Sequence, residues 1–177
     1  MSNQWLIDGS HSSAHFSVRH MMITNVRGEF QKLEGKLTWD PAQPEAAQIE
    51  AHVDVASLNT RDEKRDGHLK SPDFFDIEKF PTLSFKSKSV KAKGKEALVV
   101  TGDLTIHGVT KEVAFDVEGP SAATADPWGN SRIGATATAK IKRDDFDLKW
   151  NAALEAGGVL VGNDVSITID ISAIQQK

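Results

Sequence analysis

Residues 57–85 read SLNTRDEKRDGHLKSPDFFDIEKFPTLSF and contain the one segment of the chain that is typical of a helix. Thr60 is followed by Glu63 at the spacing of a capping box, in which each side chain bonds a backbone N–H at the helix start. The charged run 61–66 would form the solvent-facing side of this helix. The proline after Ser71 disfavours helical backbone at that residue, so the helix is predicted to end there.

Two adjacent aromatic residues, Phe74 and Phe75, follow the predicted helix directly. A polar helix that ends in paired aromatic rings is typical of a lid or plug held in an apolar interior. The two rings either anchor the helix or form a gate, and the sequence leaves both roles open.

The rest of the chain alternates between apolar and polar residues, which is typical of β-strands with one buried face. Residues 48–55 are a clear example, because every second residue of this run is apolar. A bulge or bend is predicted near Gly35, since Leu33 is out of phase with its neighbours, and another bend at Gly102. The predicted strands are residues 5–8, 14–19, 28–39, 48–55, 82–90, 98–106, 111–118, 132–143 and 164–172.

About eight strands that each have one apolar face predict an all-β, antiparallel sheet, because parallel sheets are buried on both faces. Such a sheet closes as a sandwich or as an up-and-down barrel. The length of several strands favours the barrel, and eight strands are enough to enclose one small ligand. The three alanines within residues 133–141 either accommodate bulky neighbours or leave a cavity.

Composition narrows the classes of function. The 177 residues fit a single domain, residues 1–177, that can bury a core without metals or disulfides. The absence of cysteine excludes disulfides, thiolate metal sites and a cysteine nucleophile. The net charge of −4 argues against nucleic acid as the main partner.

From the given residues, neither a membrane-spanning segment nor an export signal is expected. No apolar run approaches the length of a transmembrane helix, so stable membrane insertion is not expected. The first residues have neither the basic start nor the apolar core of a signal peptide. A cytoplasmic location is therefore expected, or a periplasmic one if a native leader has been removed.

Several motifs resemble the YceI-like family of bacterial lipocalin-like proteins and occur in the family's order over nearly the whole chain. They are DGSHS at residues 8–12, FSVRH at 16–20, RDGHL at 65–69, SPDFF at 71–75, GDLTIHGVTK at 102–111, DPWG at 126–129 and VSITI at 165–169. The resemblance implies a lipocalin-like, elongated eight-stranded antiparallel barrel, often dimeric, that binds a polyisoprenoid or similar long apolar chain. Family members are regarded as binders, so no enzyme activity and no cofactor beyond the bound lipid are implied.

The inward-facing apolar residues are either ordinary core or the wall of a ligand cavity, and the resemblance favours the cavity. Burying about ten CH₂ groups at ~0.8 kcal/mol each would drive binding without specific contacts. Arg19, His20, Arg61 and Arg65 either form structural pairs or contact a polar or phosphorylated head group. The predicted ligand-binding residues are Phe16, Val18, Met21, Phe30, Phe74, Phe75, Phe85, Val100, Leu104, Phe115, Ile133, Ala135, Ala137, Phe146, Trp150, Val165 and Ile167.

No metal site and no catalytic residues are predicted. His11 and His15 are four residues apart, which suits a metal only on a helix, whereas in a strand they would be roughly 13 Å apart. The acidic run 144–147 is expected in a solvated turn. Patterns of serine hydrolases, zinc proteases and P-loop proteins do not occur.

The leading hypothesis is non-catalytic binding, storage or transport of a long-chain isoprenoid, such as an isoprenoid quinone or its polyprenyl precursor, or of a similar fatty or amphiphilic lipid. One alternative is an enzyme that acts on such a lipid through His20 or His68. Another is an interaction or stress-response module with a filled core. Under the leading hypothesis, Ala137→Phe is predicted to block the lumen.

Overall fold

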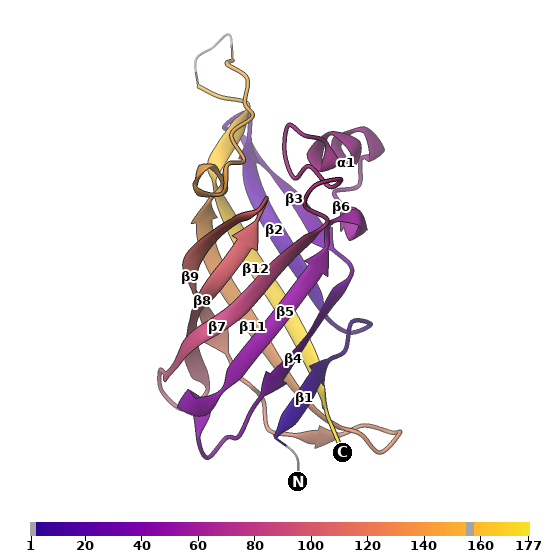
Figure 1. The fold of residues 1–177 in the computed structure, drawn as a ribbon, viewed down its shortest axis with the longest axis vertical. Coiled ribbons are helices and arrows are strands. Elements are labelled where there is room, and N and C mark those ends of the chain that lie inside the picture. Colours follow the sequence, from indigo (N-terminus) through magenta and orange to yellow (C-terminus); the bar gives the residue numbers. More distant parts are fainter. Residues whose placement is uncertain (1–2, 155–157) are drawn as a thin grey trace.

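The molecule is an antiparallel β-barrel that carries its α-helix at one end (Figure 1). The computed structural model describes residues 3–154 and 158–177. The helices are α1 (Glu63–Lys70), η1 (Pro44–Ala46), η2 (Val55–Ser57) and η3 (Arg143–Phe146). The strands are β1 (Gln4–Ile7), β2 (Ser13–His20), β3 (Thr24–Phe30), β4 (Leu33–Thr38), β5 (Gln48–Asp54), β6 (Leu58–Asn59), β7 (Thr82–Ala92), β8 (Ala97–Ile106), β9 (Val109–Glu118), β10 (Thr124–Ala125), β11 (Ser131–Lys142) and β12 (Val161–Gln175).

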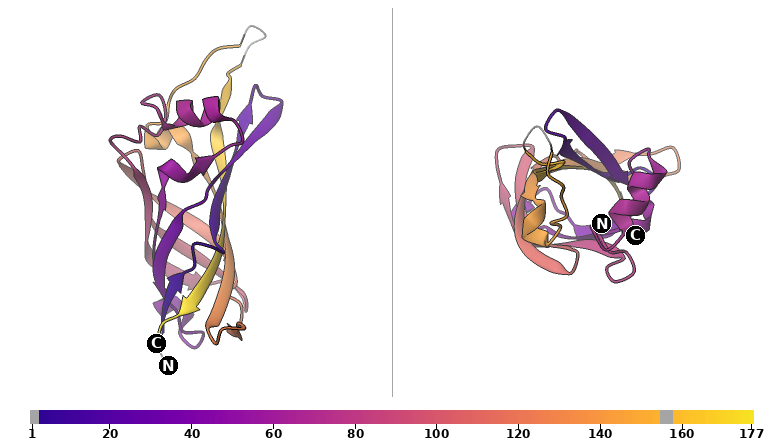
Figure 2. Two further views of the ribbon diagram at one scale, coloured as in Figure 1. Left: turned by 90° about the vertical axis from the view of Figure 1, so that its right-hand side faces the viewer. Right: turned by 90° about the horizontal axis from the view of Figure 1, so that it is seen from above.

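The barrel is closed by β12, which pairs with β11 on one edge and with both β1 and β2 on the other. Around the ring the order is β11, β9, β8, β7, β5, β4, β1 and β12. β2 and β3 extend the wall toward the end of the barrel that carries α1 (Figure 2). The predicted all-β, lipocalin-like barrel of eight antiparallel strands with one short helix is therefore confirmed.

The prediction of one strand over residues 28–39 is wrong, because β3 and β4 are separate. β3 pairs with β2, whereas β4 pairs with β1 and β5. The out-of-phase Leu33 is the buried first residue of β4, not a sign of a bulge. Gly35 lies in regular pairing with β5, and a Cβ there would come within 2.3 Å of the carbonyl oxygen of Glu50. Glycine at this position allows the two strands to approach.

The helix α1 is present, but the predicted capping box is wrong. Asp62 is the N-cap, and its carboxylate accepts hydrogen bonds from two backbone N–H groups of the first turn. These bonds, with the backbone of Arg65 first, hold the pKa of Asp62 below its usual value. Thr60 instead donates its hydroxyl to Asp66. The helix ends before Ser71, as predicted, and no helix in residues 3–154 and 158–177 has the length and apolarity to cross a bilayer.

The interior is divided along the barrel into two apolar clusters. The cluster toward α1 includes Phe30, Val55 and Leu104. The other cluster lies toward the chain termini and is called the plug here. Its buried members are Trp5, Trp39, Val90, Leu98, Val100, Ile133 and Ala173. Trp5 is only 4% exposed and donates its indole N–H to the carbonyl of Trp39 at 3.3 Å, so this end of the barrel is filled.

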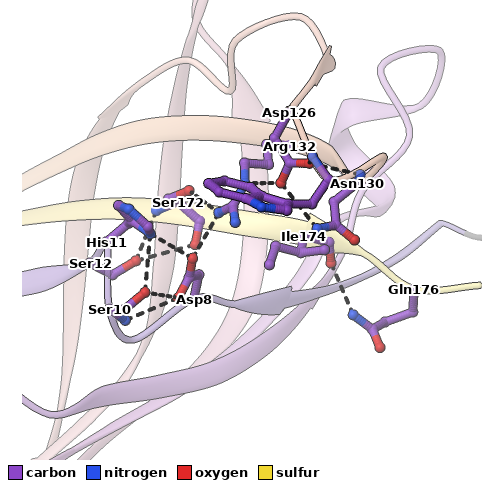
Figure 3. A network of polar contacts seen from close by, with 11 residues as sticks. Asp8, Ser10, His11, Ser12, Asp126, Asn130, Arg132, Ser172, Ile174 and Gln176 are labelled. Carbon is purple, nitrogen blue, oxygen red and sulfur yellow. Dashed lines mark hydrogen bonds and ion pairs between the residues drawn. The ribbon is translucent and has the colours of Figure 1, made fainter.

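A polar network links three segments at the plug end (Figure 3). Arg132 on β11 contacts carboxylate oxygens of both Asp8 and Asp126 at 2.7 Å. Hydrogen bonds from Arg132 and Ser10 hold the pKa of Asp8 well below its usual range. Burial opposes the ionisation of Asp126, but bonds from Arg132 and Asn130 outweigh it, and the pKa of Asp126 is lowered too. The network therefore needs both carboxylates ionised.

We expect Arg132→Ala to destabilise the barrel at neutral pH and to flatten its acid sensitivity. A carboxyl with a lowered pKa in the folded state contributes its full stabilisation at pH values above its unfolded pKa of about 3.9. This contribution is lost as the pH falls from the unfolded pKa toward the lower folded pKa. The difference in unfolding free energy between wild type and variant should be constant from about pH 8 to 5 and shrink below about pH 4. Urea unfolding at several pH values measures it.

Lys36→Ala is the control for this prediction, because Lys36 forms an exposed ion pair with Glu50 at 3.6 Å. Exposed pairs contribute little, so this variant should unfold like the wild type. A difference for Arg132→Ala that is equally large at acidic and neutral pH would contradict the assignment.

Candidate ligand-binding cavity

An apolar cavity of about 490 Å³ lies inside the barrel between the plug and α1. This volume is within the ~300–1,000 Å³ range of small-molecule sites. Its wall is formed by inward-facing residues of several strands, because side chains alternate between the two faces of a strand. Eleven of the predicted apolar residues line it: Phe16, Val18, Phe30, Phe74, Phe75, Phe85, Leu104, Phe115, Trp150, Val165 and Ile167.

Six predicted apolar residues do not line this cavity: Met21, Val100, Ile133, Ala135, Ala137 and Phe146. Val100 and Ile133 belong to the plug, where inward-facing side chains contact one another across the barrel. Ala137 is buried and does not itself line the cavity, but its cross-strand partner Ile169 does, so blockage by Ala137→Phe stays a prediction. Met21 lies at the exposed turn between β2 and β3.

Three aromatic rings meet at the end of the cavity that lies toward α1, and they are called the mouth cluster. The ring centroid of Trp150 is 4.7 Å from that of His68 and 5.4 Å from that of Phe74. His68 also contacts a carboxylate oxygen of Asp73 through Nε2 at 2.8 Å. All three rings line the cavity. Because Trp150 follows η3 and the others belong to the α1 segment, the cluster joins two segments on opposite sides of the barrel end (Figure 2).

The paired phenylalanines occupy different places. Phe74 is in the mouth cluster, whereas Phe75 packs edge-on against Phe30, with ring centroids 5.7 Å apart. Phe30 in turn contacts Phe16, which lies on β2. Phe74 therefore lies at the mouth of the cavity and Phe75 packs against the core, and the gate and anchor roles of the two rings stay predictions.

The lysine and arginine residues at the cavity have no acidic counterpart in its wall. Arg19, Lys64, Arg65 and Arg143 line the cavity, and none of the lining residues in the described part of the chain is an aspartate or a glutamate. His20 lines it as well, but Arg61 does not. Three of the four predicted head-group residues thus border the cavity.

Arg143 is the functional candidate that sequence reasoning missed. Its side chain is almost fully enclosed, at 6% exposure, and donates to the carbonyls of Leu148, Trp150, Val161 and Gly162 at 2.6–3.2 Å. Burial lowers the pKa of Arg143, and the charge of Asp144 partly offsets this. Its position in the strand alternation could have revealed it, because Arg143 follows Ile141 by two positions and so continues the inward face of β11.

Sequence comparison places the chain in a family. The sequence model of the YceI-like domain matches residues 5–173. The chain belongs to the YceI-like family. A UPF0312 protein of Pseudomonas putida strain W619 is 35% identical over 179 residues, which cover all of this chain and 89% of that protein.

Solved structures share the fold of this YceI-like protein. A YceI protein of Campylobacter jejuni matches with a TM-score of 0.75 and 30% identity, covering 90% of each chain. A polyisoprenoid binding domain from Saccharophagus degradans matches with a TM-score of 0.72 and covers 99% of this chain and 100% of that one. Its sequence identity is 16%, so this second likeness shows the fold alone.

Other parts of this YceI-like protein offer less support for a site. Among residues 3–154 and 158–177, no group of three or more histidines and carboxylates could hold a metal ion. A polar hollow of about 730 Å³ lies beside η1, and there Glu50 contacts both Lys36 and Lys86 at 3.6 Å. His68 and Asp73 form the arrangement nearest to an acid–base pair at the cavity.

We expect Trp150→Ala to speed the release of a bound long-chain ligand by roughly tenfold. The substitution removes two ring contacts worth about 0.5–1.5 kcal/mol each, and 1.4 kcal/mol corresponds to a factor of ten. Stopped-flow release of a fluorescent ligand measures the rate. Trp128→Ala is the control, because this tryptophan is exposed and does not line the cavity. Equal release rates for Trp150→Ala and wild type would show that the mouth cluster is not a gate.

Proposed function

We propose that this YceI-like protein is a non-catalytic carrier or reservoir for a long-chain isoprenoid or a similar amphiphile. The observation that carries the proposal is the apolar cavity of about 490 Å³, which is blocked by the plug at one end and bordered by the mouth cluster at the other. An apolar chain would bind there without specific contacts, because each buried CH₂ contributes ~0.8 kcal/mol. The shared fold of the Saccharophagus degradans polyisoprenoid binding domain supports the isoprenoid class.

The arrangement of charges supports one orientation of the ligand. The plug fills the end near the termini, so the apolar tail would point toward it and the head group would stay near α1. The lysine and arginine residues that line the cavity, Arg19, Lys64, Arg65 and Arg143, have no lining carboxylate beside them. A head group with negative charge, such as the phosphate of a polyprenyl precursor, would form charge-assisted hydrogen bonds there.

A pair of ligands with the same tail tests both parts of the proposal. Geranylgeraniol and geranylgeranyl phosphate should each displace an apolar polyene fluorophore from the protein. The phosphate should bind about tenfold tighter, because a hydrogen bond to a charged group is worth about 1.5–3 kcal/mol. The double variant Arg19→Gln, Lys64→Gln should lose this advantage and keep the affinity for the alcohol.

The control is Lys36→Gln, Lys86→Gln, which removes the same charge from the outside of the barrel. Failure of both compounds to displace the fluorophore would contradict the carrier proposal. Equal affinities for both compounds would contradict the head-group assignment and leave the tail in the cavity.

The two alternatives from the sequence have weaker support. An open cavity of this size argues against a module with a filled core. An enzyme would need a positioned acid–base pair, and the contact of His68 with Asp73 lies at the rim, where both side chains are more than one-third exposed. Dimer formation stays a prediction, and sedimentation velocity tests it.

A further inference from the structure

The turn between β2 and β3 presents three consecutive large apolar side chains to solvent. Met21, Met22 and Ile23 are 43%, 58% and 70% exposed, and together they are called the apolar tip. Turns of hairpins are usually built from polar residues and glycine. Side chains of this kind add nothing to a core when they are exposed, and they favour association with other apolar surfaces.

The backbone of the apolar tip does not explain its composition. Ile23 N–H donates to the carbonyl of His20 at 3.2 Å, which closes a β-turn. The two central residues, Met21 and Met22, have φ values of 52° and 61°. Positive φ at both central positions is the pattern of a type I′ turn, for which asparagine and glycine are preferred because other side chains are strained there. Methionine at both positions is therefore unfavourable for the turn itself.

The apolar tip is adjacent to the cavity wall. It lies at the same end of the barrel as α1 (Figures 1 and 2). The N–H of Met21 donates to the carbonyl of Leu160 at 2.7 Å, and Leu160 lines the cavity. Val159, next to Leu160, is also exposed, at 42%. The tip is thus bonded to a residue of the cavity wall, and an exposed apolar side chain lies next to that residue in the sequence.

The strands that flank the apolar tip carry positive charge, and their one acidic residue, Glu29, lies near the end of β3 that is far from the tip. Residues 13–28 include Arg19 and Arg27 and contain no aspartate or glutamate, although the chain has a net charge of −4. Neither arginine forms an ion pair with a described carboxylate. Apolar side chains beside basic ones are typical of segments that insert shallowly among phospholipid head groups.

We infer that the apolar tip inserts into the surface of a phospholipid bilayer and places the mouth of the cavity against the membrane. This inference rests on the proposed function, because a long apolar chain partitions into bilayers and has to pass between a bilayer and the cavity. The tip would shorten the path of that chain through water. The basic residues beside the tip favour a bilayer that contains anionic lipid.

Vesicle sedimentation tests the inference with a matched control. The test variant is Met21→Ser, Met22→Ser, Ile23→Ser, and the control is Trp128→Ser, which removes an apolar side chain that is 79% exposed and does not line the cavity. Wild type and control should sediment with vesicles of equal parts phosphatidylglycerol and phosphatidylcholine. The test variant should partition about tenfold less, with an unchanged melting temperature. If it fails to fold, Met22→Lys alone serves as a second variant, with the same loss expected.

A second measurement separates this inference from the proposed function. Uptake of geranylgeraniol from vesicles should slow about tenfold in the test variant, whereas its affinity for geranylgeraniol added from ethanol should match the wild type. Unchanged vesicle partition and uptake would overturn membrane docking and leave the carrier proposal standing. Absence of uptake by the wild type from either source would overturn the carrier proposal itself. If the test variant turns a dimer into a monomer and still binds vesicles, the tip is a contact between two copies of the chain, and the inference is wrong.

Discussion

Replacing Val165 with tryptophan is expected to abolish the binding of a long-chain ligand and to leave the barrel folded. Val165 lies on β12, points into the cavity, and is flanked across the sheet by Val18 and Ile141. An indole ring there would take the space of several CH₂ groups of the ligand. Displacing about four of them at ~0.8 kcal/mol each would weaken binding by roughly two orders of magnitude.

Ser166→Trp is the matched control for this substitution. Ser166 is the next residue along β12 and is exposed, because neighbouring residues in a strand face opposite sides. The control adds the same ring to the outside of the barrel and should bind ligand like the wild type. Displacement titration with geranylgeraniol gives both affinities. Wild-type affinity in Val165→Trp would show that the ligand lies elsewhere.

The largest loss of stability is expected from Trp5→Ala. Trp5 is almost fully buried in the plug and bonds the backbone of Trp39 through its indole N–H. Truncation of a buried tryptophan to alanine costs about 3–5 kcal/mol, since the apolar contacts are lost and a cavity remains. The free energy of unfolding from urea titration measures this cost.

Trp128→Ala is the control for the plug, because Trp128 lies before β11 and is mostly exposed. Surface substitutions of this kind usually change stability by no more than about 0.5 kcal/mol. If Trp5→Ala lowered the free energy of unfolding by as little as Trp128→Ala, the stabilising role given to the plug would be contradicted. The barrel would then not depend on a filled end near the chain termini.

The positions of most strands and their inward faces could be predicted from the sequence, because the alternation of apolar and polar residues is a local property. Residues 48–55 and 98–106 show it, and both form strands whose apolar residues face the interior. The break between β3 and β4 could not be located in this way, because the change of partner strand depends on β1 and β5, which are distant in sequence. Leu33 showed only that the alternation was interrupted.

The candidate site could be predicted only in part. Alternation assigns Val100 and Val165 equally to the interior, but only contacts across the barrel place the first in the plug and the second at the cavity. The mouth cluster could not be predicted either, because Trp150 and His68 are far apart in the sequence and come into contact only in the folded chain. Arg143 was in phase with the inward face of β11 but is charged, and its acceptors are carbonyls of a later loop and of β12.

The most direct test of the central claim is native mass spectrometry of the protein purified from its own host, followed by solvent extraction of any bound compound. The account predicts a mass increase that corresponds to one molecule of a long-chain isoprenoid or similar amphiphile per chain, lost in Val165→Trp and retained in Ser166→Trp. A bare protein mass, together with no uptake of added geranylgeraniol, would contradict it.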